Sequence, residues 1–339
     1  MTRTVKRAVV AVALGLVAAK VALDHARLVE PQRDFTQLWF AARALWRGEN
    51  PYLEIGHGLA YDWPAPLVYP LPAAIAAMPL AWLPQDIANA VFMFIGATAF
   101  AYALTRQGWG PLLGFFSGSM LVAVEIVQWS PLFAAATVVP VFGIVLATKP
   151  TIGAAIFAAR PSWWAIGGGL LLVLAAFLFD PLWLLHWRDA LARNAAIQPP
   201  NAPYVAPISF PGGLLVLTAL LRWRRPEARL IAVLATVPQT MLPYETVPLF
   251  IIATAWHEAL LLMALSWGAL VWLVSHVDPT DYRPFLATSG PVMVLMLYLP
   301  ATLMVLRRPN EGTVPAWLER AAARWPAWLR GSPASATDA

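Results

Sequence analysis

The sequence predicts an all-α protein, a polytopic bundle of transmembrane helices. Of its 339 residues, 60% are hydrophobic and only 12% are charged, whereas soluble domains carry about 25% charged residues. The mean hydropathy is +0.64, and apolar runs recur along most of the chain. The 17 tryptophans fit this class, because indole rings favour the membrane interface. Most of the surface is therefore expected to face lipid rather than water.

The N-terminal residues 1–23 are expected to form the first transmembrane helix. Arg3, Lys6 and Arg7 precede its apolar run. A cleaved signal peptide is the alternative, which is less favoured because further apolar runs follow. The basic flank places the N-terminus in the cytoplasm. Residues 24–66, with four arginines and six acidic residues, then form an extracytoplasmic loop.

Residues 67–306 are expected to form the helical bundle. The arginine cluster at 222–229 belongs inside, so an even number of spans must precede it. Seven apolar runs do, and therefore one run, either the proline-rich 67–83 or 131–148, does not cross. The sequence predicts about eight to ten spans with both termini cytoplasmic. The runs after the loop are 67–83, 87–104, 111–127, 131–148, 163–184, 205–221, 230–242, 247–274 and 285–306.

Residues 307–339 are expected to form a cytoplasmic tail. Trp317, Trp325 and Trp328 recur at near-helical spacing with arginines between them. This pattern predicts an interfacial helix on the anionic leaflet. Pro326 is expected to end or kink it.

An amphipathic helix is expected in the external loop, beginning at Asp34. Gly48 and Asn50-Pro51 end it. Thr36 and Gln37 lie away from its apolar stripe, and we expect that stripe to lie on the outer membrane surface. The stripe comprises Phe35, Leu38, Trp39, Ala42, Leu45 and Trp46.

Asp34 has two compatible interpretations. From periodicity alone its carboxylate is a helix N-cap, which contributes about 1 kcal/mol. A capped carboxylate is also held in one direction, as a general base must be.

The loop sequence resembles a known enzyme family. Asp34-Phe35, the Ala-Ala-Arg-Ala-Leu run at 41–45 and Gly-Glu-Asn-Pro-Tyr at 48–52 are similar to the first-loop motif of glycosyltransferase family 87. These membrane enzymes of the GT-C superfamily include polyprenyl-phosphate-mannose-dependent mannosyltransferases and related pentosyltransferases. Tyr-Pro-Leu-Pro at 69–72, the segment 78–84 and Lys149-Pro150 also resemble family segments. The similarity is sharp over residues 34–84.

The resemblance implies a GT-C-type bundle and a glycosyltransferase of the plasma (inner) membrane. A sugar, mannose or a pentose, would pass from a polyprenyl phosphate to a glycolipid or glycan acceptor at the extracytoplasmic face, with inversion. Asp34 would take the proton of the acceptor hydroxyl, and an inverting reaction needs no separate nucleophile.

Transfer also needs groups that hold the donor. The basic candidates for the leaving phosphate are Arg33, Arg43, Arg47, His57, His186 and Arg188. The remaining substrate-binding candidates are Gln37, Tyr69, Glu125, Gln128 and Lys149. Polar residues inside apolar runs are costly and should face a cavity or a partner; Asp180, Glu245 and His257-Glu258 are further examples. The alternative for each is an interfacial position that meets headgroups or water.

The composition also limits cofactors and partners. The chain has no cysteine and its five histidines lack metal-site spacing, so we expect no cofactor but leave a divalent cation open. The expected partners are the lipid bilayer, the polyprenyl-phosphate-linked sugar and its acceptor, and no nucleic acid. A transporter or lipid flippase, or a non-catalytic membrane subunit, is the competing interpretation.

Overall fold

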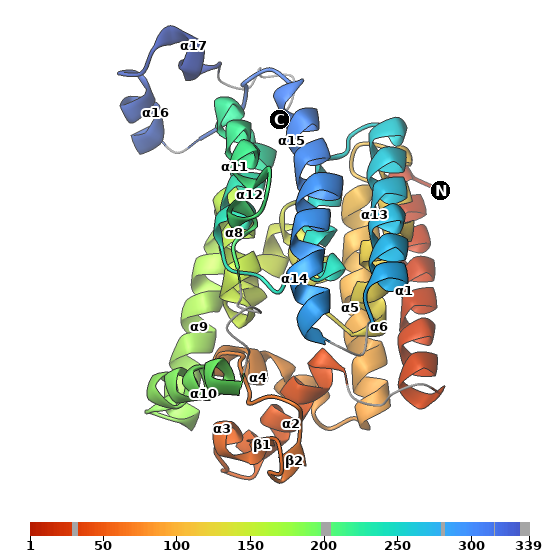
Figure 1. Ribbon diagram of the computed structural model, residues 1–339, viewed down its shortest axis with the longest axis vertical. Helices are drawn as coiled ribbons and strands as arrows, with labels where there is room; N and C mark the ends of the chain where they lie inside the picture. Colours follow the sequence, from red (N-terminus) through yellow and green to blue (C-terminus); the bar gives the residue numbers. More distant parts are fainter. Residues whose placement is uncertain (29–32, 198–204, 279–281, 315, 333–339) are drawn as a thin grey trace.

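The computed structural model describes residues 1–28, 33–197, 205–278, 282–314 and 316–332. Four helical segments within them are long and apolar enough to cross a membrane: α1 (Arg3–Leu28), α5 (Gln85–Leu104), α13 (Trp256–His276) and Ala287–Leu306. The last belongs to α14 (Tyr282–Met293), the π-helix η7 (Val294–Tyr298) and α15 (Leu299–Leu306). These segments run between the two ends of the molecule (Figure 1). The expected helical membrane class is thus supported.

Two bent helix pairs raise the number of candidate spans to six. They are α6 (Gly118–Glu125) with α7 (Ser130–Ala136), bent by 120°, and α9 (Trp163–Phe179) with α10 (Trp183–Ile197), bent by 91°. Four to six candidate spans in the described residues are fewer than the eight to ten predicted. Other apolar runs fold into helices too short to span, at Leu71–Leu80, Pro150–Ala159 and Gly213–Arg222. The first of these lies in the run 67–83.

The remaining elements are short and connect or cover these helices. They are α2 (Asp34–Trp46), α3 (Pro51–Glu54), the parallel pair β1 (Ile55–Gly56) and β2 (Tyr61–Asp62), α4 (Leu71–Ala77), η1 (Met78–Leu80), η2 (Gly110–Phe116), η3 (Pro140–Thr148), α8 (Pro150–Ala159), η4 (Pro207–Ser209), α11 (Gly213–Val216), η5 (Leu217–Arg222), α12 (Pro226–Thr236), η6 (Pro243–Ile252), α16 (Ala316–Ala322) and α17 (Ala327–Arg330).

Helix α1 packs along α5 through a stripe of small residues. Ala11, Gly15, Ala18 and Ala22 are its buried positions, together with Ala26 nearer the helix end. A Cβ atom on Gly15 would lie 1.9 Å from the Thr98 hydroxyl of α5. Small residues allow membrane helices to approach closely, and a larger residue at position 15 would force the Thr98 side chain to move.

Helix α2 forms with the predicted bounds but is more enclosed than a surface helix. It lies with α3, α4 and α10 at one end of the molecule (Figure 1). Thr36 and Gln37, expected on its polar face, are buried. Asn89 of α5 donates to the Thr36 hydroxyl at 3.0 Å, and Gln37 donates to the Pro66 carbonyl at 3.4 Å. These partners replace water, so the polar side also packs against protein.

The tail docks against the segment after η5. Its first helix, α16, ends at Ala322, four residues before the expected end at Pro326, and Pro326 is instead the N-cap of α17. The rings of Trp223 and Trp325 lie 5.0 Å apart, and Arg224 binds the Glu319 carboxylate with two hydrogen bonds of 2.6 and 2.7 Å. Positions 29–32 of the predicted loop and 315 and 333–339 of the predicted tail lie outside the described residues.

Candidate functional site

Asp34 is tied to the turn between α6 and α7. Its backbone N–H donates to the Ile126 carbonyl at 3.1 Å, and its carboxylate accepts a hydrogen bond from the side-chain amide of Gln128. The N-cap position of α2 is Arg33, whose backbone N–H donates to the Thr36 hydroxyl at 3.2 Å. The N-cap role that periodicity predicts for Asp34 is therefore wrong, because Asp34 is already the first residue of α2 and its carboxylate accepts from Gln128.

A strained residue stands between these two contacts. Val127 has φ 55°, a left-handed conformation that is unusual for a β-branched residue. The N–H of Gln128 donates to the Ala123 carbonyl at 2.9 Å, so the turn closes α6 in the way that glycine usually does. Such strain costs about 1–3 kcal/mol and is typical of functional sites. Here it brings the Ile126 carbonyl and the Gln128 amide to the same residue, Asp34.

Aromatic packing holds the start of α2 against α5 and α7. The rings of Phe35 and Phe92 stack at 4.1 Å, and Trp129 contacts Phe92 edge-on at 4.7 Å. Phe35 and Trp129 directly follow Asp34 and Gln128 in the chain. Aromatic pairs of this kind contribute about 0.5–1.5 kcal/mol beyond burial. The two polar residues are thus held in place by the aromatic residues that follow them.

Lys149 is a largely buried cation whose charge influences the Asp34 carboxylate. It lies between η3 and α8, and its ammonium group donates to the Tyr244 hydroxyl at 3.2 Å. The Glu245 carboxylate lies 3.6 Å from the same nitrogen, and both side chains are largely buried. The Lys149 charge also acts on Asp34. Asp34, Gln128, Lys149, Tyr244 and Glu245 are hereafter the Asp34 cluster.

The Glu245 end of the cluster repeats the strained geometry. Met241 has φ 57° and, with Val127, is one of the two non-glycine residues of the described chain with positive φ. Its N–H donates to the Glu245 carboxylate at 2.8 Å. Both strained residues of the described chain therefore support polar groups of the Asp34 cluster.

Burial shifts the pKa of Asp34, which lies in α2, outside the candidate spans. Burial raises the pKa of its carboxyl group above the usual value, while the Lys149 charge and the Gln128 hydrogen bond oppose this effect. The side chain keeps partial exposure. The carboxylate is therefore oriented by Gln128 and is a stronger base than a solvated aspartate.

Other candidates have structural partners away from this cluster. Arg33 is buried and donates to the His25 carbonyl at 3.2 Å. Tyr69 is buried, and its backbone carbonyl accepts from the Tyr52 hydroxyl at 3.1 Å. Gln37 binds Pro66, as described above. We assign these three to holding the loop around α2.

Arg43 and Arg47 point along α2 away from Asp34. Arg43 lies nine residues after Asp34, about 13 Å along a helix, and stacks over the Trp39 ring at 4.8 Å. Arg47 pairs with Glu49 and donates to the Tyr61 hydroxyl at 2.7 Å. Neither is placed beside the carboxylate.

The remaining candidates divide between exposed and enclosed positions. His57 is exposed and lies 3.5 Å from Asp62, and Arg188 is an exposed partner of Asp189. The Nδ1 atom of His186 lies 2.6 Å from the Asp180 carboxylate and 2.9 Å from the Asn50 amide. Glu125, at the end of α6, is half-buried and has no hydrogen bond or ion pair to the described residues.

Sequence reasoning missed Tyr244, although it noted the neighbouring Glu245. The signal was the intrusion of Glu245 between two apolar runs, since a buried acid requires a partner. No group of three or more metal-ligating His, Asp or Glu side chains occurs within the ranges that the structure describes.

The chain was compared with family models, curated proteins and solved structures. No match was found in any of the three comparisons.

Proposed function

We propose that the protein is a membrane glycosyltransferase with Asp34 as its general base. The donor is a polyprenyl-phosphate sugar, mannose or a pentose, and the acceptor is a hydroxyl group of a lipid or glycan. One observation carries the proposal: the half-buried Asp34 carboxylate accepts a hydrogen bond from Gln128 and feels the positive charge of Lys149. The resemblance of residues 34–84 to family 87 supports the substrate class.

The chemistry requires one proton transfer and one displacement. The acceptor oxygen attacks the anomeric carbon as its proton passes to the Asp34 carboxylate. The bond from the anomeric carbon to the phosphate oxygen breaks, and the polyprenyl phosphate leaves with the electron pair. Lys149 is the group we assign to the leaving phosphate, because a cation stabilises the charge that develops there.

Glu245 and Tyr244 hold the Lys149 ammonium group in position. With its carboxylate 3.6 Å away, the ammonium is held in place before substrate binds, and Tyr244 directs it further through a hydrogen bond. Preorganised charges need little rearrangement during the reaction.

Asp34→Asn tests the proposal. Membranes containing the wild type or the variant are incubated with labelled polyprenyl-phosphate mannose or pentose, and the labelled product is measured. Loss of a general base should reduce transfer about 10²–10⁴-fold, while thermal stability in detergent is not lowered. Asp24→Asn is the matched control, because Asp24 is an exposed partner of Lys20 in α1 and should transfer normally.

The same experiment addresses the transporter alternative, which the buried Lys149–Glu245 pair also suits. Full transfer by Asp34→Asn would reject the proposed base. Movement of labelled lipid across vesicles, without a glycosylated product from the wild type, would favour a transporter.

A further inference from the structure

A second polar site lies at the end of the molecule opposite α2. Helix α5 starts near α2 and α4 and ends at the opposite end (Figure 1). A cavity of about 100 Å³ lies there, lined by Arg106 beyond α5 and Arg160 beyond α8, with Gln107, Thr137 and Glu227. A water needs about 10–15 Å³ by this measure, so a group of several heavy atoms fits.

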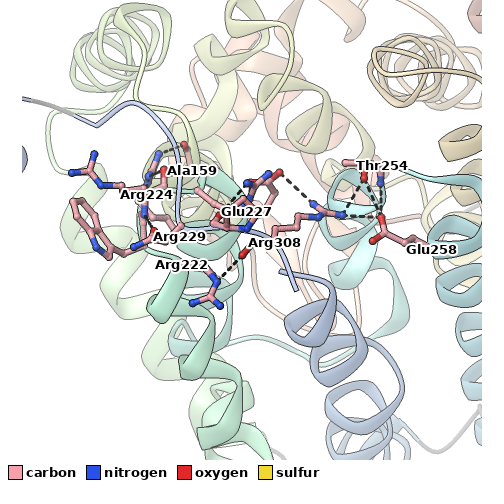
Figure 2. A network of polar contacts seen from close by, with 12 residues as sticks. Ala159, Arg222, Arg224, Glu227, Arg229, Thr254, Glu258 and Arg308 are labelled. Atoms are coloured by element: carbon pink, nitrogen blue, oxygen red, sulfur yellow. Dashed lines mark hydrogen bonds and ion pairs between the residues drawn. The ribbon is translucent and has the colours of Figure 1, made fainter. Parts of the chain in front are cut away.

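Neighbouring contacts hold both arginines in place. Arg229 donates to the carbonyls of Ala158 and Ala159 at 2.9 and 3.0 Å, closing the end of α8 directly before Arg160 (Figure 2). Arg3 donates to the Arg106 carbonyl at 3.3 Å. The backbones that carry the two guanidinium groups are therefore anchored by other arginines.

The acids at this end are already matched by other cations. Glu227 lies 3.5 Å from Arg308 and 3.6 Å from Arg225, and Glu258 lies 2.7 Å from Arg308. Figure 2 shows this network around Arg308. The charges of Glu227 and Glu258 are thus balanced by those of Arg225 and Arg308. Arg106 and Arg160 are surplus positive charges in one cavity.

The donors of the surplus pair are mostly unused. Arg160 makes one side-chain hydrogen bond within the described ranges, to the Thr137 carbonyl at 3.1 Å, although a guanidinium carries five N–H groups. Arg106 makes no side-chain hydrogen bond to the described residues. Burial, and then the charge of Arg106, lower the pKa of Arg160, which agrees with two like charges close together. An anion between them would relieve this repulsion.

We infer that Arg106 and Arg160 bind a phosphate group at this end of the protein. The planar guanidinium matches phosphate oxygens in paired hydrogen bonds, and Thr137 and Gln107 add polar walls. The phosphate is either free or part of a lipid headgroup. This inference does not depend on the proposed transferase reaction, because the site shares no residue with the Asp34 cluster.

Binding to purified protein in detergent tests the inference. Inorganic phosphate is added in a thermal-shift titration, with chloride at equal ionic strength as reference. Retention of phosphatidic acid over phosphatidylcholine is measured by native mass spectrometry. Stabilisation by inorganic phosphate identifies a free anion as ligand, and selective retention of phosphatidic acid alone identifies a headgroup.

The variants Arg106→Gln and Arg106→Gln/Arg160→Gln should weaken the observed binding about tenfold or more. Arg27→Gln is the matched control, because Arg27 is half-exposed, pairs with Asp86 and lies at the other end of α1. Should the double variant fail to fold, Arg106→Gln alone decides, since its side chain is exposed. Binding of neither probe, or equal losses in Arg27→Gln and Arg106→Gln, would overturn the inference.

Discussion

The side-chain amide of Gln128 donates a hydrogen bond to the Asp34 carboxylate and so joins the first loop to the turn between α6 and α7. The two residues are 94 positions apart in the chain. The strained Val127 lies directly before Gln128. The orientation of the proposed base therefore depends on a distant turn.

Gln128→Leu should lower kcat of sugar transfer by up to about 10²-fold, because a displacement of about 1 Å can cost that much. The carboxylate stays but loses its orienting donor. The KM for the donor should change little, since Gln128 contacts the base. Steady-state kinetics measure kcat and KM separately. An unchanged kcat would exclude a positioning role for Gln128.

Transfer should depend on pH through a raised pKa of Asp34. Burial raises that pKa, so the rising limb of kcat/KM should lie above about pH 3.9, the usual value for aspartate. Lys149→Met removes a charge that lowers the pKa and should move the limb to higher pH. A limb that moves to lower pH in this variant would contradict the assignment.

The raised pKa of Asp34 also affects folding stability, which should fall as pH rises. Folding favours the protonated form of Asp34, so its contribution to stability is full below about pH 3.9 and is lost as pH rises through the folded-state pKa. Asp34→Asn should remove this loss, which thermal unfolding across pH in detergent measures.

Lys149 and Glu245 should be energetically coupled. Lys149→Met leaves Glu245, whose side chain is 3% exposed, without its cation, and should lower the free energy of unfolding by about 3–5 kcal/mol. Lys149→Met/Glu245→Gln should recover much of the loss, because the buried charge is removed as well. Thermal unfolding of the wild type, Lys149→Met, Glu245→Gln and the double variant completes the double-mutant cycle. Additive losses would show that the two residues are independent.

Gly15→Ala should destabilise the contact between α1 and α5. The added Cβ would lie 1.9 Å from the Thr98 hydroxyl and 3.1 Å from the Phe94 carbonyl, and such overpacking costs about 1–3 kcal/mol. Gly167→Ala in α9 is the control, because nothing lies within 4 Å of its Cβ position. Equal thermal stability of the two variants would contradict close packing at Gly15.

The sequence alone predicted a helical chain with apolar helices long enough to cross a membrane, and it predicted the bounds of α2. Composition and apolar runs reflect whether the surface meets lipid or water. Both are totals along the chain and need no knowledge of its folded contacts. The stripe from Phe35 to Trp46 predicted a helix because its spacing is local. An interruption of the tail helix was expected from Pro326, which lacks an N–H, although α16 already ends at Ala322. The sequence also marked Asp34, Gln128 and Lys149 as candidate site residues, each separately.

Only the tertiary structure decided which of these residues meet. Arg43 and Arg47 share a helix with Asp34 but extend away from it, whereas Gln128 reaches it through a turn in which Val127 adopts positive φ. The burial of Thr36 depends on Asn89 of another helix. The short helices at Pro150–Ala159 and Gly213–Arg222 were not predicted, because hydropathy does not register where a backbone bends. The proline-rich run 67–83 was already one of the two runs expected not to cross. Contacts between distant segments depend on packing, which local periodicity does not encode.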